Sequence, residues 1–127
     1  MRDHGYRRRF LPGDEVRLNL EIIKYVRMHV REAGVVFRHV EHDQSELTAS
    51  GPPETIGGQS NVARLTLPIP AVATPGLYRV NRMWVETYGG RRYDYEGEEV
   101  PEHASTLAFE VDEEPDAKPQ LSLSYHL

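Results

Sequence analysis

The chain has no cysteine among its 127 residues, which excludes disulfide bonds, thiolate zinc sites and thiol catalysis. Long apolar runs are also missing. None approaches the roughly 20 residues that a membrane-spanning helix needs, so we expect no membrane span. The basic residues 1–10 are not followed by an apolar stretch and therefore do not form a secretory signal. The sequence is compatible with the cytoplasm and with export after removal of a signal.

Aromatic residues make up 9% of the chain, with a single tryptophan among them. An apolar fraction of 39% and a charged fraction of 28% fit one globular domain with a well-solvated surface. The net charge of −5 argues against a nucleic-acid partner. The charge is unevenly distributed: residues 1–10 predict a flexible basic arm, whereas the last third is acidic. These opposite charges could attract each other within one chain or between copies.

Alternation of apolar and polar residues is the main structural signal. After a turn at 11–14, the apolar residues Val16, Leu18 and Leu20 alternate with polar ones, and residues 24–31 alternate again, which predicts strands with one buried face. A helix within 14–33 is the alternative, because part of the apolar set also fits helical spacing, and it would make the fold α+β. The cleaner alternation and the β-branched residues favour strands.

The rest of the chain predicts further strands, a linker and a last strand-like segment. Asn81 and Arg82 are expected to form a bulge, because the apolar residues change phase there. Gly89 and Gly90 predict a two-residue hairpin turn. Residues 50–60 and 96–103 read as loops, 11–111 as one all-β domain, 112–119 as a linker and 120–127 as a terminal strand or tail. The expected strands are 35–40, 46–49, 61–67, 77–88, 91–95 and 105–111, the last with Leu107, Phe109 and Val111 in the core.

The segment Gly76-Leu77-Tyr78-Arg79-Val80 resembles the start of the sixth strand in immunoglobulin-like domains. Val80 stands where many members have a cysteine, as in the immunoglobulin-like and fibronectin-like domains of bacterial type. The resemblance implies a sandwich of about seven or eight antiparallel strands, in which the tyrosine hydroxyl bonds back to the preceding turn. It also implies an adhesion, spacer or recognition module. An antibody-type domain is not expected, because residues 35–40 contain no tryptophan. The excess of arginine over lysine suggests a GC-rich bacterial source.

No metal or cofactor site is predicted. On a strand, His39 and His42 would point to opposite faces, and only a turn beginning at Glu41 would bring them together, with Asp43 nearby. The serines lie outside any nucleophile-elbow context and no phosphate-binding loop is present, so we do not expect an enzyme. An acidic group could supply oxygen ligands to calcium, although it lacks EF-hand spacing: Asp94, Glu96, Glu98, Glu99 and Glu102.

The hairpin at 84–95 is the candidate contact surface of a non-catalytic binding or interaction module. It combines tyrosine, arginine and tryptophan, the residue types that are enriched in recognition surfaces. The expected partner is a protein or a glycan. The alternatives are cross-strand aromatic pairs that only stabilise the hairpin, a calcium- or carbohydrate-binding accessory domain, and a self-assembling homo-oligomer that uses the C-terminal strand. The candidate binding residues are Trp84, Glu86, Tyr88, Arg91, Arg92, Tyr93 and Tyr95.

Overall fold

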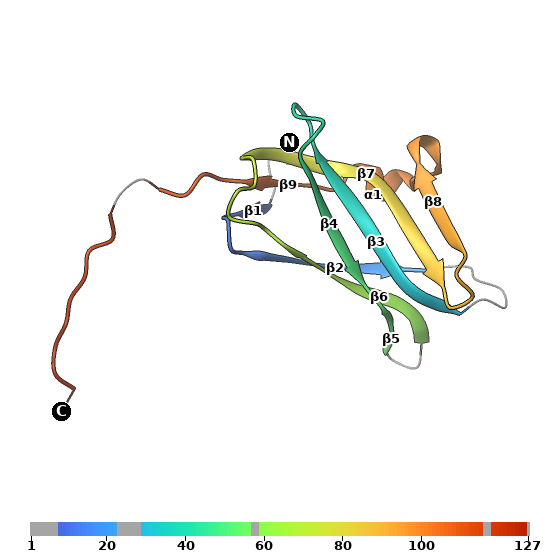
Figure 1. The fold of residues 1–127 in the computed structure, drawn as a ribbon, viewed down its shortest axis with the longest axis horizontal. Helices are drawn as coiled ribbons and strands as arrows, with labels where there is room; N and C mark the ends of the chain where they lie inside the picture. Colours follow the sequence, from blue (N-terminus) through green and yellow to red (C-terminus); the bar gives the residue numbers. More distant parts are fainter. Residues whose placement is uncertain (1–7, 23–28, 57–58, 116–117, 127) are drawn as a thin grey trace.

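A computed structural model of the chain describes residues 8–22, 29–56, 59–115 and 118–126, and it is mostly β (Figure 1). Two short helical segments follow the eighth strand: the 3-10 helix η1 (Gly97–Glu99) and the α-helix α1 (Glu102–Ser105). The nine strands are β1 (Arg8–Phe10), β2 (Glu15–Glu21), β3 (Val30–His39), β4 (Glu46–Gly51), β5 (Pro53–Ile56), β6 (Gln59–Pro68), β7 (Gly76–Thr87), β8 (Arg92–Glu96) and β9 (Ala108–Val111).

The strands form one continuous sheet in the order β1-β9-β7-β3-β4-β6-β2, with β5 beside β6 and β8 beside β7. The β4–β6 link is a single residue pair, Ser50 with Thr66. At this weak link the sheet bends, so that β2 and β6 lie across from β3, β4 and β7 (Figure 1). The sheet therefore curls towards a barrel. The expected set of seven or eight antiparallel strands is wrong in two respects, because the described residues form nine strands and β1 pairs with β9 in parallel.

The choice between strand and helix near the N-terminus is settled for the described residues. Glu15–Glu21 is a strand paired with β6 along its whole length, and Val30–His39 is a strand between β4 and β7. Residues 23–28 lie outside the described residues. Val16 is buried and Leu18 and Leu20 pack against the core, as alternation with one buried face requires.

The expected bulge in the long strand β7 is confirmed. Val36 pairs with Arg82 and Phe37 pairs with Val80, so Asn81 is the extra residue. The expected two-residue turn is wrong, because the Thr87 N–H donates to Arg91 O and leaves three residues, 88–90, in the loop. Of its two glycines only Gly90 has a positive φ, +89°. A three-residue loop with one left-handed glycine is a common hairpin connection, and the Gly-Gly pair suits it equally well.

Several short elements differ from expectation. Residues 50–60, expected to be a loop, contain β5 and the start of β6. Residues 96–103 contain η1 and the start of α1. The arm expected at 1–10 is a strand at Arg8–Phe10, while residues 1–7 lie outside the described residues. Leu107, expected in the core, is 46% exposed, because β9 begins only at Ala108.

One cluster of buried apolar residues forms the core inside the curled sheet. Phe37 and Phe109 have ring centroids 4.9 Å apart, and Tyr78 stacks on Phe109 at 5.6 Å. Val100, between η1 and α1, also joins this cluster, so the two short helical segments cover part of the core. Strands β2, β3, β4, β6, β7 and β9 all contribute to it.

Candidate functional site

The β7–β8 hairpin separates the predicted contact residues onto two faces of the sheet. Residues that pair directly across two strands share a face. Trp84 pairs with Asp94 and Glu86 with Arg92, on the face opposite the core, here called the outer face. Tyr93 pairs with Val85 and Tyr95 with Met83, both of which belong to the core.

Trp84 is held in one place on the outer face. Its indole lies directly over Gly34 of β3, where any Cβ would collide with the ring. The Arg92 guanidinium carbon lies over the indole, 4.5 Å from the ring centroid, which is a favourable cation–π geometry. The Arg92 Nε also donates to Asp94 Oδ1 at 3.0 Å. Trp84 is thus half-buried and fixed between a backbone and a cation.

The other predicted contact residues have different environments. Tyr88, at the hairpin tip, is 71% exposed, and its backbone N–H donates to His29 O at 3.0 Å. Arg91 is exposed, and its backbone N–H donates to Thr87 Oγ1 at 3.2 Å. Tyr93 is partly buried and Tyr95 is exposed, on the side of β8 that faces the same way as their partners Val85 and Met83. The structure therefore brings together Trp84, Glu86 and Arg92, with Tyr88 at the end of the hairpin.

The outer face also carries ion pairs that involve residues outside the hairpin, from β3 and β4. Arg31 of β3 pairs with Glu86. On β4, Glu46 Oε2 accepts hydrogen bonds from Arg38 Nη2 of β3 at 2.8 Å and from Arg82 Nη1 of β7 at 3.4 Å. The sequence does contain one signal for this face: Gly34 in the middle of a strand, which is typical of a close approach by another group.

His39 and His42 do approach each other, because residues 41–45 form a turn, and their ring centroids are 4.6 Å apart. His39 is nevertheless fully engaged. Its Nδ1 accepts a hydrogen bond from the Glu41 N–H at 3.0 Å, so the Nε2–H donates to Pro75 O at 2.8 Å. His39 therefore ties two loops together and has no lone pair available for a metal. Among the described residues, no group of three or more potential ligands could hold a metal ion.

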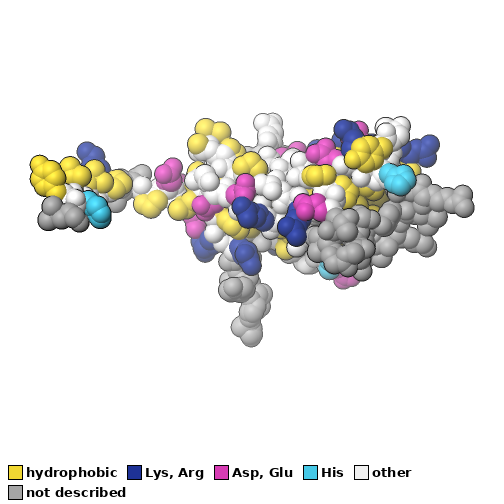
Figure 2. Space-filling model, turned by 90° about the horizontal axis from the view of Figure 1, so that it is seen from below, with side chains coloured by type: hydrophobic (Ala, Val, Ile, Leu, Met, Phe, Trp, Pro, Cys, Tyr) yellow, Lys and Arg dark blue, Asp and Glu magenta, His cyan; other side chains and the backbone are white. Residues whose placement is uncertain are grey.

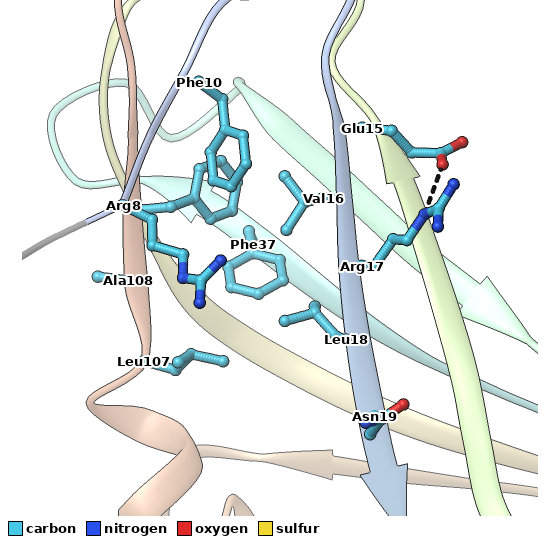
Figure 3. A pocket seen from close by; sticks show the side chains of 11 residues that line it. Arg8, Phe10, Glu15, Val16, Arg17, Leu18, Asn19, Phe37, Leu107 and Ala108 are labelled. Carbon is cyan, nitrogen blue, oxygen red and sulfur yellow. Dashed lines mark hydrogen bonds and ion pairs between the residues drawn. The ribbon is translucent and has the colours of Figure 1, made fainter.

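A groove of about 640 Å³ lies where the two ends of the sheet meet. Strand β2 forms one wall, and β1 with β9 forms the other (Figure 3). Among the described residues, β2 pairs only with β6, so no strand is paired with its groove-side edge. The Arg8 side chain extends from β1 towards the Phe37 ring (Figure 3). The apolar lining residues are Phe10, Val16, Leu18, Phe37, Leu107, Ala108 and Phe109.

The C-terminal segment carries the most exposed large apolar side chains of the described residues. Residues 118–126 form no helix or strand, and Leu121, Leu123 and Tyr125 are 93%, 99% and 95% exposed. Figure 2 shows yellow apolar side chains of this C-terminal segment away from the folded part of the chain. Of the two structures expected at 120–127, a terminal strand or a tail, the described residues 120–126 form a tail that is drawn out in Figure 1 and is not a strand, and Leu127 lies outside the described residues.

Comparisons with family models, with curated proteins and with solved structures found no match to this chain. None of the helices in the described part of the chain is long and apolar enough to cross a membrane.

Proposed function

We propose that this chain is a non-catalytic interaction module that binds a protein partner through the outer face of β3, β7 and β8. One observation carries the proposal: Trp84, the single tryptophan, lies on this outer face and not in the core. Tryptophan, tyrosine and arginine supply most of the anchoring residues in protein interfaces, and they do so best when they are held rigid before binding. Gly34 and Arg92 provide that rigidity for Trp84.

The electrostatics of the outer face support a binding role. Glu86 is paired with Arg31, and Arg92 with Asp94. These charged groups are already neutralised by neighbours, which suits the polar rim of an interface better than acid–base chemistry. Exposed Tyr88 extends the surface past the end of the hairpin.

A glycan is the weaker candidate for a partner. A sugar stacks on an open aromatic face, but the indole of Trp84 lies over Gly34 and under the Arg92 guanidinium. A bound sugar would have to displace Arg92 and lose the cation–π contact. A protein partner can use the same stacked pair without displacing it.

For the fold, the proposal is a variant of the bacterial immunoglobulin-like sandwich. The Tyr78 hydroxyl donates to Thr74 O at 2.7 Å, which is the contact expected of the tyrosine corner. The neighbours β3, β7 and β9 match the third, sixth and seventh strands of such a domain, and β2 beside β6 matches the second and fifth. An experimental structure with two separate sheets packed face to face would support this assignment, and a closed barrel would contradict it.

The binding proposal is tested by affinity capture followed by titration of each captured protein. The test variant is Arg92→Glu, and Arg64→Glu is the control, because it makes the same charge change at an exposed site on β6. We expect proteins that bind the wild type and Arg64→Glu, with a Kd at least about 10-fold weaker for Arg92→Glu. Capture of no protein, or equal affinity for all three chains, would overturn the proposal.

A second variant, Gly34→Ala, changes the outer face without changing its charge. The added Cβ has no room beneath the indole, so Trp84 must move. Since Trp84 is the only tryptophan, its fluorescence reports this movement directly. We expect altered emission together with weaker binding. Altered emission with unchanged affinity would show that Trp84 is not an anchor.

A further inference from the structure

We infer that the groove between β2 and the β1–β9 pair receives the C-terminal segment of a second copy of this chain as an added β-strand. The inference concerns a surface distinct from the outer face and does not depend on the function proposed above. It joins two independent observations: an apolar groove beside an edge of β2 to which no described strand is paired, and an extended segment whose apolar side chains are almost fully exposed.

The C-terminal segment has the side-chain pattern of a strand at the edge of a sheet. If the segment were a strand, Leu121, Leu123 and Tyr125 would lie on one side, and Ser122 and Ser124 on the other. Such a strand can turn its apolar side towards a core and its serine side towards water. In the single chain the apolar side is solvated, at 93% exposure or more. Apolar side chains exposed together in this way are typical of an interaction surface.

The groove has the matching chemistry. Phe10, Leu18 and Leu107 contribute apolar lining at its walls, with Phe37 behind them. The edge of β2 offers backbone N–H and C=O groups to an incoming strand, which is how strand addition gains affinity. Residues 121–126 span about 20 Å when extended, at about 3.3 Å per residue. This length is comparable to that of the seven-residue strand β2.

A second copy fits the groove better than the chain's own tail. The point at which the chain leaves β9 is fixed beside β1. There the Asp112 N–H donates to Phe10 O at 2.8 Å, and Arg9 Nη1 donates to Asp112 Oδ1 at 2.9 Å. To enter its own groove, the chain would have to reverse direction between 113 and 120. That stretch contains Pro115, Pro119 and neighbouring carboxylates, which favour an extended linker.

The first experiment measures molar mass by light scattering as a function of protein concentration. We expect the mass of the wild type to rise above that of one chain as concentration rises. Two changes should abolish the rise: the triple variant Leu121→Ser, Leu123→Ser, Tyr125→Ser on the donor side, and Leu107→Glu on the acceptor side. Leu107 is suitable because it lines the groove yet is 46% exposed, so its replacement spares the core.

The matched control is Ser122→Asn with Ser124→Asn, which alters the same segment on its other side and should associate as the wild type does. A wild type that stays monomeric at every concentration would overturn the inference. So would association that persists in the triple variant or in Leu107→Glu. Arg92→Glu should self-associate normally, so failure of this inference and failure of the outer-face proposal are distinguishable.

The second experiment uses the absence of cysteine to place single thiols. A chain with Leu107→Cys is mixed under oxidising conditions with a chain carrying a cysteine at 121, 123 or 125. We expect at least one of these mixtures to form a mixed disulfide more efficiently than mixtures with Ser122→Cys or Ser124→Cys, because only one side of the segment faces the groove. Equal linking at all five positions, or none at any, would contradict docking.

The same thiols identify the occupant. The double variant Leu107→Cys with Leu123→Cys can form a disulfide within one chain or between two. Disulfide-linked multimers would support docking of the C-terminal segment in the groove of another copy. A disulfide confined to monomers, at a concentration where the wild type associates, would show that the chain's own tail occupies the groove and would overturn the inference.

Discussion

At the scale of single residues, Tyr78 stabilises the folded state in two separable ways. Its ring is buried against Phe109, and its hydroxyl donates to Thr74 O at 2.7 Å. Tyr78→Phe keeps the ring and removes only the hydrogen bond. We expect the free energy of unfolding to fall by about 1 kcal/mol at neutral pH, as measured by urea denaturation. Tyr88→Phe is the control, because that side chain is largely exposed. Equal effects of the two substitutions would contradict a stabilising role for the hydroxyl.

The same hydroxyl predicts a pH dependence at the alkaline end. Burial raises the pKa of Tyr78 above its usual value of about 10. The unfolded chain therefore loses this proton before the folded chain does, and folding is linked to keeping it. The contribution is complete below about pH 10 and is lost as the pH rises from there through the folded pKa. Between about pH 9 and about pH 11, the wild type should lose more stability than Tyr78→Phe. Parallel stability curves would contradict this.

At the scale of elements, β1 is the shortest strand of the described residues. It has three residues and one neighbour, β9. Phe10 packs edge-on against Phe109 at 5.7 Å, and Phe10 O accepts the Asp112 N–H. Phe10→Ala removes the ring that anchors β1. We expect hydrogen exchange of the Asp112 amide to accelerate by about 10-fold or more, while amides of β3 exchange as before, because β1 opens locally.

The control for Phe10→Ala is Leu11→Ala, which truncates a more exposed apolar side chain at the next residue. It should leave exchange at Asp112 close to the wild-type rate. If Phe10→Ala accelerated exchange in β3 to the same extent as at Asp112, β1 would belong to the global unfolding unit and the prediction would be wrong.

The elements also show what the sequence could and could not predict. The long strand β7 and its bulge at Asn81 were predictable, because twelve residues carry enough alternation to show a change of phase. Strands β1 and β5 were not, because three or four residues hold no period and their stability comes from partners. For β1 that partner lies about a hundred residues away, at Phe109.

The candidate site was likewise predictable only in part from the sequence. The sequence places Trp84 and Glu86 on one face of β7, because they alternate with Met83 and Val85. It does not say which face is the core, since both carry apolar residues. That choice follows from the pairing with β3, which places Gly34 beneath the indole. The groove was not predictable at all, because its walls come from opposite ends of the sheet.

At the scale of the whole molecule, the two proposed binding surfaces lie on different parts of the curled sheet and would not compete. The outer face lies on the solvent side of β3, β7 and β8, whereas the groove opens between β2 and the β1–β9 pair. One copy could therefore hold a partner on the outer face while its groove accepts a neighbour's segment. A contact between unlike surfaces repeats from copy to copy, so such a module would display its partner along an array unless the contacts close into a ring.

A rigid binding surface on the outer face requires that this face unfold only together with the core behind it. A single core cluster joins β2, β3, β4, β6, β7 and β9, and Trp84 lies directly over Gly34 in the central strand β3. We therefore expect urea unfolding followed by Trp84 fluorescence and by far-ultraviolet circular dichroism to give the same midpoint, because local loss of the outer face would require β3 to move. The triple variant Leu121→Ser, Leu123→Ser, Tyr125→Ser should also give equal midpoints by the two probes, since its substitutions leave the core unchanged. A fluorescence midpoint at lower urea would mean that the β7–β8 hairpin opens alone, and Trp84 would then be an adaptable contact and not a rigid anchor.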